Sequence, residues 1–152
     1  MTLFRRLRLA MLLVLAGALV APARCDELAI VVIMASGTAP GKLSREQLGL
    51  IFKNKRRFWD DGSRIQPVNL PASHTVRRSF TQQVYNRSPE ELEDYWRDQY
   101  FHGVMPPFVL GSEEAVIRLV AATPGAIGYI SVCSLDHRVS VVLRLDGAAC
   151  PR

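Results

Sequence analysis

A continuous apolar run from Leu28 to Met34 constrains the fold of this chain more than any other feature. Its sequence, LAIVVIM, is rich in β-branched residues and contains no polar residue, which is typical of a strand covered on both faces. A strand of that kind needs helices packed on each side of its sheet. The sequence therefore predicts a single α/β domain with a mixed sheet and helices packed on it.

Helices and strands are predicted to alternate along the rest of the chain. Strands are expected at 65–70, 126–132 and 139–145, and the last of them is predicted to pair with the first strand. Helix starts are indicated where a capping residue precedes apolar residues at helical spacing. These capping residues are Ser44, Ser88 and Ser112.

A basic segment, KNKRR from Lys53 to Arg57, follows the first predicted helix. Runs of this kind are most often solvated faces, although four cations in five residues could also bind an acidic partner. The turn Asp60-Asp61-Gly62 supplies counter-charge nearby. We expect the aromatic pair between them, Phe58 and Trp59, to pack against the core and close the loop.

Residues 1–23 are typical of a secretory signal peptide. Three arginines precede an unbroken apolar run, and Ala21-Pro22-Ala23 offers a small-x-small cleavage site. The apolar run is too short to span a bilayer as a mature anchor. We therefore expect cleavage near Ala23, a periplasmic or secreted protein without a stable membrane anchor, and a single domain over residues 24–152.

The formal net charge of +5 overstates the basicity of the mature protein. Three of the nineteen basic residues and none of the fourteen acidic residues lie in the predicted signal peptide. The remaining balance is about +2. Together with secretion, this balance argues against nucleic acid as a partner.

Three cysteines, Cys25, Cys133 and Cys150, would face an oxidising compartment after export. One disulfide and one spare thiol is the simplest arrangement, and three small buried side chains are the alternative. If the first and last strands pair antiparallel, Cys25 and Cys150 fall at the same end of the ladder. A direct hairpin of 126–132 with 139–145 would instead carry Cys150 far from Cys133. We predict a Cys25–Cys150 disulfide, with Cys133–Cys150 as the other possible pairing.

The search for catalytic groups gives no candidate site. His74, His102 and His137 are isolated, without the spacing that brings two ligands to one face, and no Cys or carboxylate cluster suggests a metal cage. A Ser73 nucleophile beside His74 is a poor candidate, because adjacent side chains at a helix start diverge. We predict a non-enzymatic protein that needs no cofactor and no metal.

The segment PVNLPASHTVRRSF, from Pro67 to Phe80, predicts an anion-binding turn. It is expected to form a short strand, a loop and a helix with Ser73, His74 and Thr75 at its start. A helix start presents backbone N–H groups without partners in the helix and the positive end of the helix dipole, which suit a small anion. Arg77 adds positive charge. The alternative interpretation is that these residues merely cap the helix and that the arginine faces water.

Three segments resemble successive landmarks of the phosphate-binding proteins of ABC transporters. They are LSREQLGLIFKNKRRFWDDG at 43–62, PVNLPASHT at 67–75 and AATPGAIGYIS at 121–131, in that family's order and at similar intervals. The similarity spans about residues 28–145. It implies one lobe of a type II periplasmic binding protein fold, in which two α/β lobes close on a ligand. It also implies an ABC transporter membrane subunit, or another envelope protein, as a partner.

In that family the strand-to-helix loop reads Arg-Ser-x-Gly-Ser-Gly-Thr, and its hydroxyls and backbone amides hold the phosphate. Ser73 and Thr75 match the serine and the threonine of this motif. Asn69 stands where the family has its arginine, and His74 where it has a glycine, so the charged clamp is weakened. The resemblance implies contacts from Ser73, Thr75 and their amides, with His74 and Arg77 as secondary donors. Asn69, at the position of the family's arginine, completes the predicted anion-binding residues.

The family's two-lobed proteins are about twice this size, so residues 24–152 would form a single lobe. A shallow site desolvates an anion poorly, so weak binding is expected unless another chain supplies the missing face. We predict a secreted module that binds phosphate or a similar small oxyanion and is related to ABC-transporter phosphate uptake. The alternative is a protein-interaction or sensory accessory of the cell envelope that has lost ligand binding.

Overall fold

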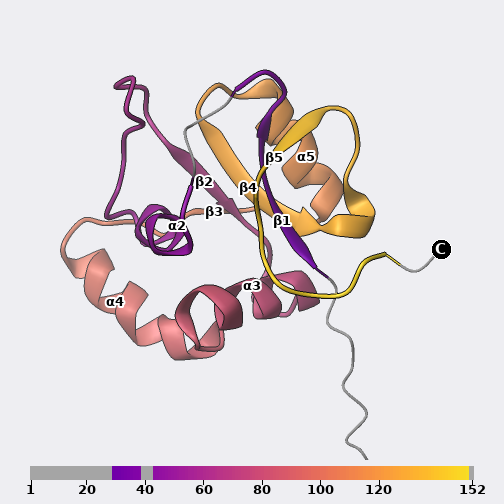
Figure 1. The fold of residues 1–152 in the computed structure, drawn as a ribbon. Helices are drawn as coiled ribbons and strands as arrows, with labels where there is room; N and C mark the ends of the chain where they lie inside the picture. The colour runs from indigo at the N-terminus through magenta and orange to yellow at the C-terminus, as the bar shows by residue number, and fades with distance from the viewer. Residues whose placement is uncertain (1–28, 39–42, 151–152) are drawn as a thin grey trace, which may run out of the picture.

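The computed structural model describes residues 29–38 and 43–150 (Figure 1). The predicted signal peptide, residues 1–23, lies outside the described residues. The elements, in chain order, are β1 (Ile30–Ala35), α2 (Arg45–Phe52), β2 (Gln66–Asn69), α3 (Thr75–Tyr85), η1 (Glu90–Leu92), α4 (Glu93–Phe101), β3 (Phe108–Val109), α5 (Glu113–Ala122), β4 (Ala126–Ser131), η2 (Val132–Ser134) and β5 (Val139–Arg144). Over the described residues, no helix is both long enough and apolar enough to cross a membrane.

Five strands of the described chain form one mixed sheet in the order β3-β2-β4-β1-β5 (Figure 1). β1 lies between β4 and β5 and is antiparallel to both. β2 runs parallel to β4 on one side and to β3 on the other. The predicted mixed sheet and the predicted pairing of the first strand with the last are therefore confirmed.

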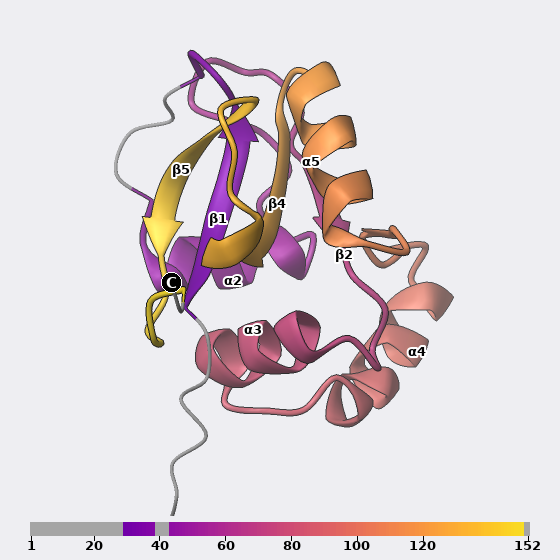
Figure 2. The same ribbon diagram turned by 90° about the vertical axis from the view of Figure 1, so that its right-hand side faces the viewer.

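Helices cover both faces of this sheet, as the apolar run of β1 requires (Figure 2). Along the fully buried strand β4, Gly128 faces α5, where an added Cβ would lie 2.6 Å from Cγ1 of Val116. The next residue, Tyr129, stacks on Phe80 of α3 with 3.8 Å between ring centroids. Because neighbouring residues of a strand point to opposite faces, α5 lies on one side of the sheet and α3 on the other.

The aromatic pair that follows the basic segment divides between the core and the surface. Trp59 is 8% exposed, and its Nε1 donates to the carbonyl of Gly125 at 3.2 Å. Phe58 is 58% exposed, so the prediction that both rings pack against the core is wrong for this residue. Phe58 bridges to Arg64 as in an antiparallel ladder, and neighbouring side chains of such a segment point to opposite sides.

The disulfide of the structure joins Cys150 to Cys133, with Cα atoms 5.2 Å apart, so the predicted pairing of Cys150 with Cys25 is wrong. Cys25 itself lies outside the described residues. The reason is the strand order: β1 separates β4 from β5, so these two strands run in the same direction instead of forming a hairpin. The backbone of Ala29, just before β1, bonds to the segments that follow β4 and β5. Both bridged cysteines therefore lie at the same end of the sheet.

Replacing Cys133 by serine is expected to lower the free energy of unfolding by about 3 kcal/mol, because the bridge spans 17 residues of sequence. Urea unfolding followed by circular dichroism measures this change. Cys150→Ser should have the same effect, and Cys25→Ser should leave the unfolding midpoint unchanged. A midpoint that falls with Cys25→Ser but not with Cys133→Ser would contradict the observed pairing.

Candidate functional site

The loop between β2 and α3 carries the residues that were predicted to bind an anion. β2 ends at Asn69, and α3 begins at Thr75 with His74 as its N-cap. The imidazole of His74 forms the cap, because its Nδ1 accepts the backbone N–H of Val76 at 3.3 Å. The backbone N–H of His74 donates to the carbonyl of Pro71 at 2.9 Å, which closes the loop into a tight turn.

Ser73 and Thr75 lie on either side of His74, and both are exposed. The first N–H groups of a helix have no acceptor within the helix, and here the cap occupies that of Val76. The two hydroxyls and the other first-turn amides form a set of donors at the positive end of α3. Such a set can bind a small anion at the surface of the protein.

Tyr129 connects the base of this loop to the sheet. Its hydroxyl donates to Oδ1 of Asn69 at 3.0 Å and accepts the N–H of Leu70 at 3.4 Å and Nη1 of Arg77 at 3.3 Å. Burial raises the pKa of the Tyr129 hydroxyl, which keeps it protonated and able to donate. One buried hydroxyl thus holds both the end of β2 and the first turn of α3.

The structure places the predicted residues at two levels. Ser73 and Thr75 lie at the surface of the loop, and His74 between them is half-buried. Asn69 is 3% exposed, and its amide oxygen bonds to Tyr129, so this residue supports the loop from below. The structure therefore brings Ser73, His74 and Thr75 together at one turn and leaves Asn69 in the interior.

Arg77 lies between these two levels. It is half-buried, and its Nη1 contacts the hydroxyl of Tyr129. Its Nε is buried and has no hydrogen-bond partner among the described residues. The guanidinium group is therefore held against the sheet while part of its donor capacity stays uncommitted.

Tyr129 is absent from the residues predicted for this site, although the sequence contains a signal for it. It stands in AIGYIS, a run in which the other large residues are aliphatic. A tyrosine buried in such a strand needs a partner for its hydroxyl. That partner, Asn69, lies 60 residues away in sequence, and no local pattern connects the two.

Three hollows of the described surface lie away from the β2–α3 loop. They are formed by other segments, and none of the three is lined by a residue between 69 and 77. Because Ser73 and Thr75 are exposed, the candidate anion site lies at the surface of the described structure. Among the described residues, no group of three or more His, Cys, Asp or Glu side chains is placed to hold a metal ion.

The sheet, the helices on both of its faces and the β2–α3 loop define a single α/β lobe of the periplasmic-binding-protein fold. An ABC-type phosphate transport receptor from Vibrio cholerae has this fold, with a TM-score of 0.61 and 23% identity over 77% of this chain and 47% of the receptor. A Clostridium perfringens protein solved with bound phosphate gives the same TM-score and identity, over 77% of this chain and 46% of its own.

Sequence similarity indicates one family among the proteins of this fold. The phosphate-binding protein PstS of Bacillus subtilis (strain 168) is 28% identical over 135 residues, which are 84% of this chain and 40% of the relative. No protein-family model matches the chain. The resemblance to the phosphate-binding proteins of ABC transporters is thus confirmed. The chain spans about two fifths of the curated relative and just under half of the two solved structures.

Proposed function

We propose that this protein is a secreted, non-enzymatic binding module that holds phosphate or a similar small oxyanion at the β2–α3 loop. The observation that carries the proposal is the pair of exposed hydroxyls, on Ser73 and Thr75, at the N-terminus of α3. The names of the curated relative and of the solved structures, which describe phosphate binding or phosphate transport, support it.

Three kinds of donor would hold the oxyanion. The hydroxyls of Ser73 and Thr75 and the first-turn amides donate directly, and the helix dipole adds positive potential. His74 adds its Nε2–H, because Nδ1 is the atom that accepts in the neutral ring. Arg77 supplies a formal charge, which strengthens hydrogen bonds to an anion.

Asn69 has a supporting role in this proposal. The arginine of the resembling family would add a second charged group, whereas Asn69 directs its amide oxygen to Tyr129 in the interior. The site therefore has one cation fewer than the site of that family. We expect the affinity for a free oxyanion to be weak, because an open surface site excludes little water.

A partner protein is part of this proposal, because the two solved structures of the same fold are named as components of ABC phosphate transport. An ABC transporter membrane subunit or another envelope protein would meet this module in the periplasm or outside the cell. Residues 1–23, which resemble a signal peptide, would direct the module there.

Phosphate at millimolar concentration is expected to raise the melting temperature of the protein by several degrees. For the weak binding expected here, phosphate at about ten times its dissociation constant stabilises the folded state by about 1.4 kcal/mol, which shifts the midpoint of a domain of this size measurably. Sulfate and related oxyanions are tested in parallel to define the selectivity. Thermal unfolding followed by circular dichroism measures the shift.

Ser73→Ala and Thr75→Val are expected to reduce the phosphate-induced shift. Ser112→Ala is the control, because Ser112 is likewise a hydroxyl residue at the start of a helix but lies at α5, which it caps through the N–H of Ala115. This control should lower the melting temperature of the free protein and leave the phosphate-induced shift unchanged. The absence of both a shift and a heat of binding with every oxyanion would contradict the proposal.

A second candidate function is a protein-interaction accessory that keeps the lobe as a scaffold. The burial of Asn69 favours it, because the charged clamp of the resembling family is missing at the loop. Reversing the four cations between Lys53 and Arg57 should then release a partner that is retained from envelope extracts. Ser73→Ala should leave that retention unchanged, which separates the two candidate functions.

A further inference from the structure

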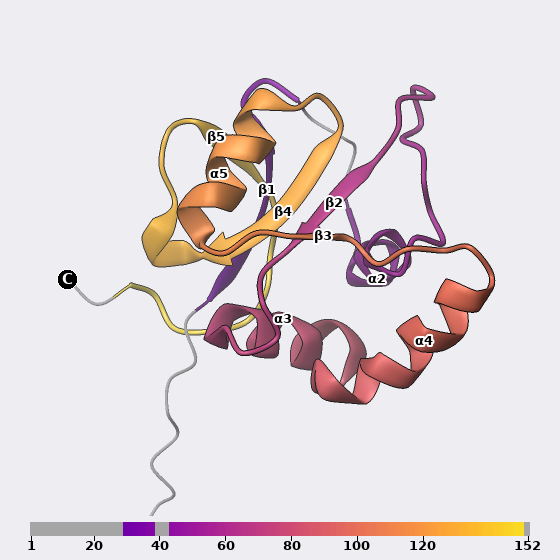
Figure 3. The same cartoon turned by 180° about the vertical axis from the view of Figure 1, so that it is seen from behind.

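A groove lies between residues 53–65, here called the basic arm, and residues 103–108, which lead into β3. Figure 3 shows the arm and the chain leading into β3, both next to β2. The groove consists of two adjoining hollows of about 190 and 460 Å³. The residues that line both hollows are Asn54, Arg64, Ile65 and Met105.

One wall of the groove is apolar and exposed. Met105 is 60% exposed and Phe108 is 69% exposed, and Val109, which follows in β3, is 54% exposed. β3 is an edge strand, so its outer side carries backbone groups that no other strand of the described chain pairs. An exposed apolar sheet edge of this kind is a surface to which another chain can bind.

The other wall is cationic and lacks counter-charge. Arg57 and Arg64 line the groove, and neither hollow is lined by an Asp or a Glu. Within the described part of the chain, neither arginine forms an ion pair. Asp60, in the acidic turn of the arm, forms an ion pair with Arg56 instead: Oδ1 of Asp60 lies 2.8 Å from Nη2 of Arg56. The groove therefore presents two positive charges that an acidic partner could neutralise.

Hydrogen bonds fix the two walls relative to each other. Nδ2 of Asn54 donates to the carbonyl of Met105 at 2.6 Å, which joins the arm to the chain before β3. Nε of Arg57 donates to the carbonyl of Asn54 at 3.2 Å. Trp59, through its bond to Gly125, ties the arm to the start of β4. The shape of the groove is thus set by the fold of this chain.

We propose that this groove binds an extended segment of another protein that carries a carboxylate beside apolar side chains. The apolar side chains would cover Met105 and Phe108, and the carboxylate would accept charge-assisted hydrogen bonds from Arg57 and Arg64. A free oxyanion would satisfy the arginines but leave the apolar wall in water. An extended segment uses both walls.

The docking groove is separate from the proposed oxyanion site. Its hollows are lined by Gln66 and Pro67, at the start of β2, whereas the β2–α3 loop follows the other end of this strand at Asn69. No residue between 69 and 77 lines either hollow. Either site can therefore be disabled while the other is left intact.

Selection of random dodecapeptides displayed on phage, with the purified protein as bait, tests the proposal. We expect the enriched sequences to contain Asp or Glu beside apolar residues. A fluorescein-labelled synthetic peptide of the most enriched sequence is then titrated with each variant. Its affinity is expected to fall at least about tenfold for the Arg57→Glu/Arg64→Glu variant, because reversed charges repel the carboxylate. Phe108→Ser should weaken binding as well.

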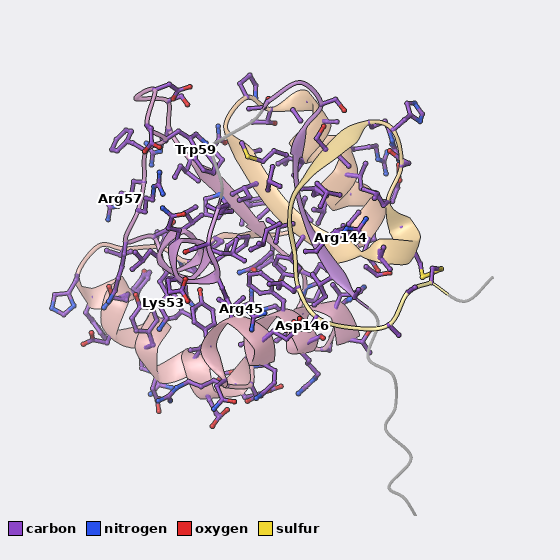
Figure 4. The ribbon with its side chains drawn as sticks, in the orientation of Figure 1. Arg45, Lys53, Arg57, Trp59, Arg144 and Asp146 are labelled. Atoms are coloured by element: carbon purple, nitrogen blue, oxygen red, sulfur yellow. A yellow bond between two sulfur atoms is a disulfide. The ribbon has the colours of Figure 1, made fainter. Side chains whose placement is uncertain are left out.

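The matched control is Arg87→Glu/Arg144→Glu, which changes the net charge equally at two exposed arginines outside the groove. Figure 4 shows Arg57 at the arm and Arg144 on a different part of the molecule. This control should bind the peptide like the wild type. Arg57→Glu/Arg64→Glu should also keep the phosphate-induced melting shift of the wild type, so the failure of one proposal is distinguishable from the failure of the other.

Four outcomes of the peptide experiments would overturn the docking proposal. They are enrichment of sequences without acidic residues, no enrichment at all, equal loss of affinity in both charge-reversed variants, and displacement of the peptide by free phosphate alone. Self-association of the protein that is abolished by Arg57→Glu/Arg64→Glu would also overturn it, because the occupant would then be a second copy of this chain. Sedimentation velocity measures that self-association.

Discussion

Replacing Gly125 by alanine is expected to lower the free energy of unfolding by about 2–5 kcal/mol. Gly125 has a φ of +76°, in the left-handed region, where a side chain costs roughly 1–2 kcal/mol. An added Cβ would also overlap the carbonyl oxygen of Arg64, a backbone atom that cannot rotate away. Overpacking of a tight contact costs roughly 1–3 kcal/mol more.

The surroundings of Gly125 leave it little room to move. Its carbonyl accepts the N–H of Gln66 at 3.0 Å and Nε1 of Trp59 at 3.2 Å. These two bonds hold the start of β4 against β2 and against the basic arm. A shift that relieved the overlap with Arg64 would therefore weaken both bonds.

Gly62→Ala separates the two causes of the expected loss. Gly62 has a φ of +84°, but an added Cβ there would meet nothing within 4 Å. This variant should lose about 1–2 kcal/mol, the cost of the backbone conformation alone. Urea unfolding of the wild type and the two variants gives both values. Equal losses at Gly62 and Gly125 would show that the overlap with Arg64 has no energetic effect.

The GAIGY segment, residues 125–129, has structural roles that its sequence does not reveal. The sequence identifies the segment as one that resembles a landmark of a protein family, but it does not show why these residues are needed. In the structure, Gly125 meets the backbone of Arg64, and Gly128 leaves room for α5 against the sheet. Tyr129 joins the sheet to the β2–α3 loop. Each of these residues is required by a contact with a distant part of the chain.

The sheet was predictable because the sequence of β1 alone indicates that this strand is buried on both faces. A run without polar residues can only be a strand or helix that is covered all round, and the β-branched residues favour the strand. The disulfide was not predictable in this way. Cys133 and Cys150 meet because β1 lies between β4 and β5. No pattern within residues 126–145 indicates that another strand lies between the two strands of this segment, β4 and β5.

In the candidate site, too, the positions set by local sequence were predictable and those set by distant contacts were not. The surface position of Ser73 and Thr75 follows from local chemistry, since small polar residues before an amphipathic helix mark its start. The interior position of Asn69 does not, because it depends on Tyr129 of another strand. The docking groove also depends on distant contacts, since Asn54 and Met105 are 51 residues apart in sequence.

Replacing Tyr129 by alanine is expected to lower the free energy of unfolding by about 4–6 kcal/mol. The ring is fully buried, stacks on Phe80 at 3.8 Å and lies 5.5 Å from the ring of Phe52. Its removal leaves a cavity between the sheet and α3, which costs about 3–5 kcal/mol for a large aromatic side chain. It also leaves the buried amide oxygen of Asn69 without the hydroxyl that donates to it. Urea unfolding followed by circular dichroism measures the change.

Tyr129→Phe isolates the hydroxyl, because it keeps the ring and removes the donor to Asn69 and the acceptor for Leu70. We expect a loss of about 1–3 kcal/mol, the cost of buried polar groups without partners. Tyr95→Phe is the control, since the Tyr95 hydroxyl donates to a carbonyl in a half-buried position away from the loop. Its loss should be smaller.

The phosphate-induced melting shift decides what the Tyr129 hydroxyl does for the loop. If the hydroxyl positions α3 and Arg77 for the oxyanion, Tyr129→Phe reduces both the stability and the phosphate-induced shift. If the stability falls and the shift is unchanged, the hydroxyl supports the core alone and the link from the sheet to the site is wrong. Wild-type stability in Tyr129→Phe would contradict the role of this hydroxyl altogether, because Asn69 would then have found another partner in the interior.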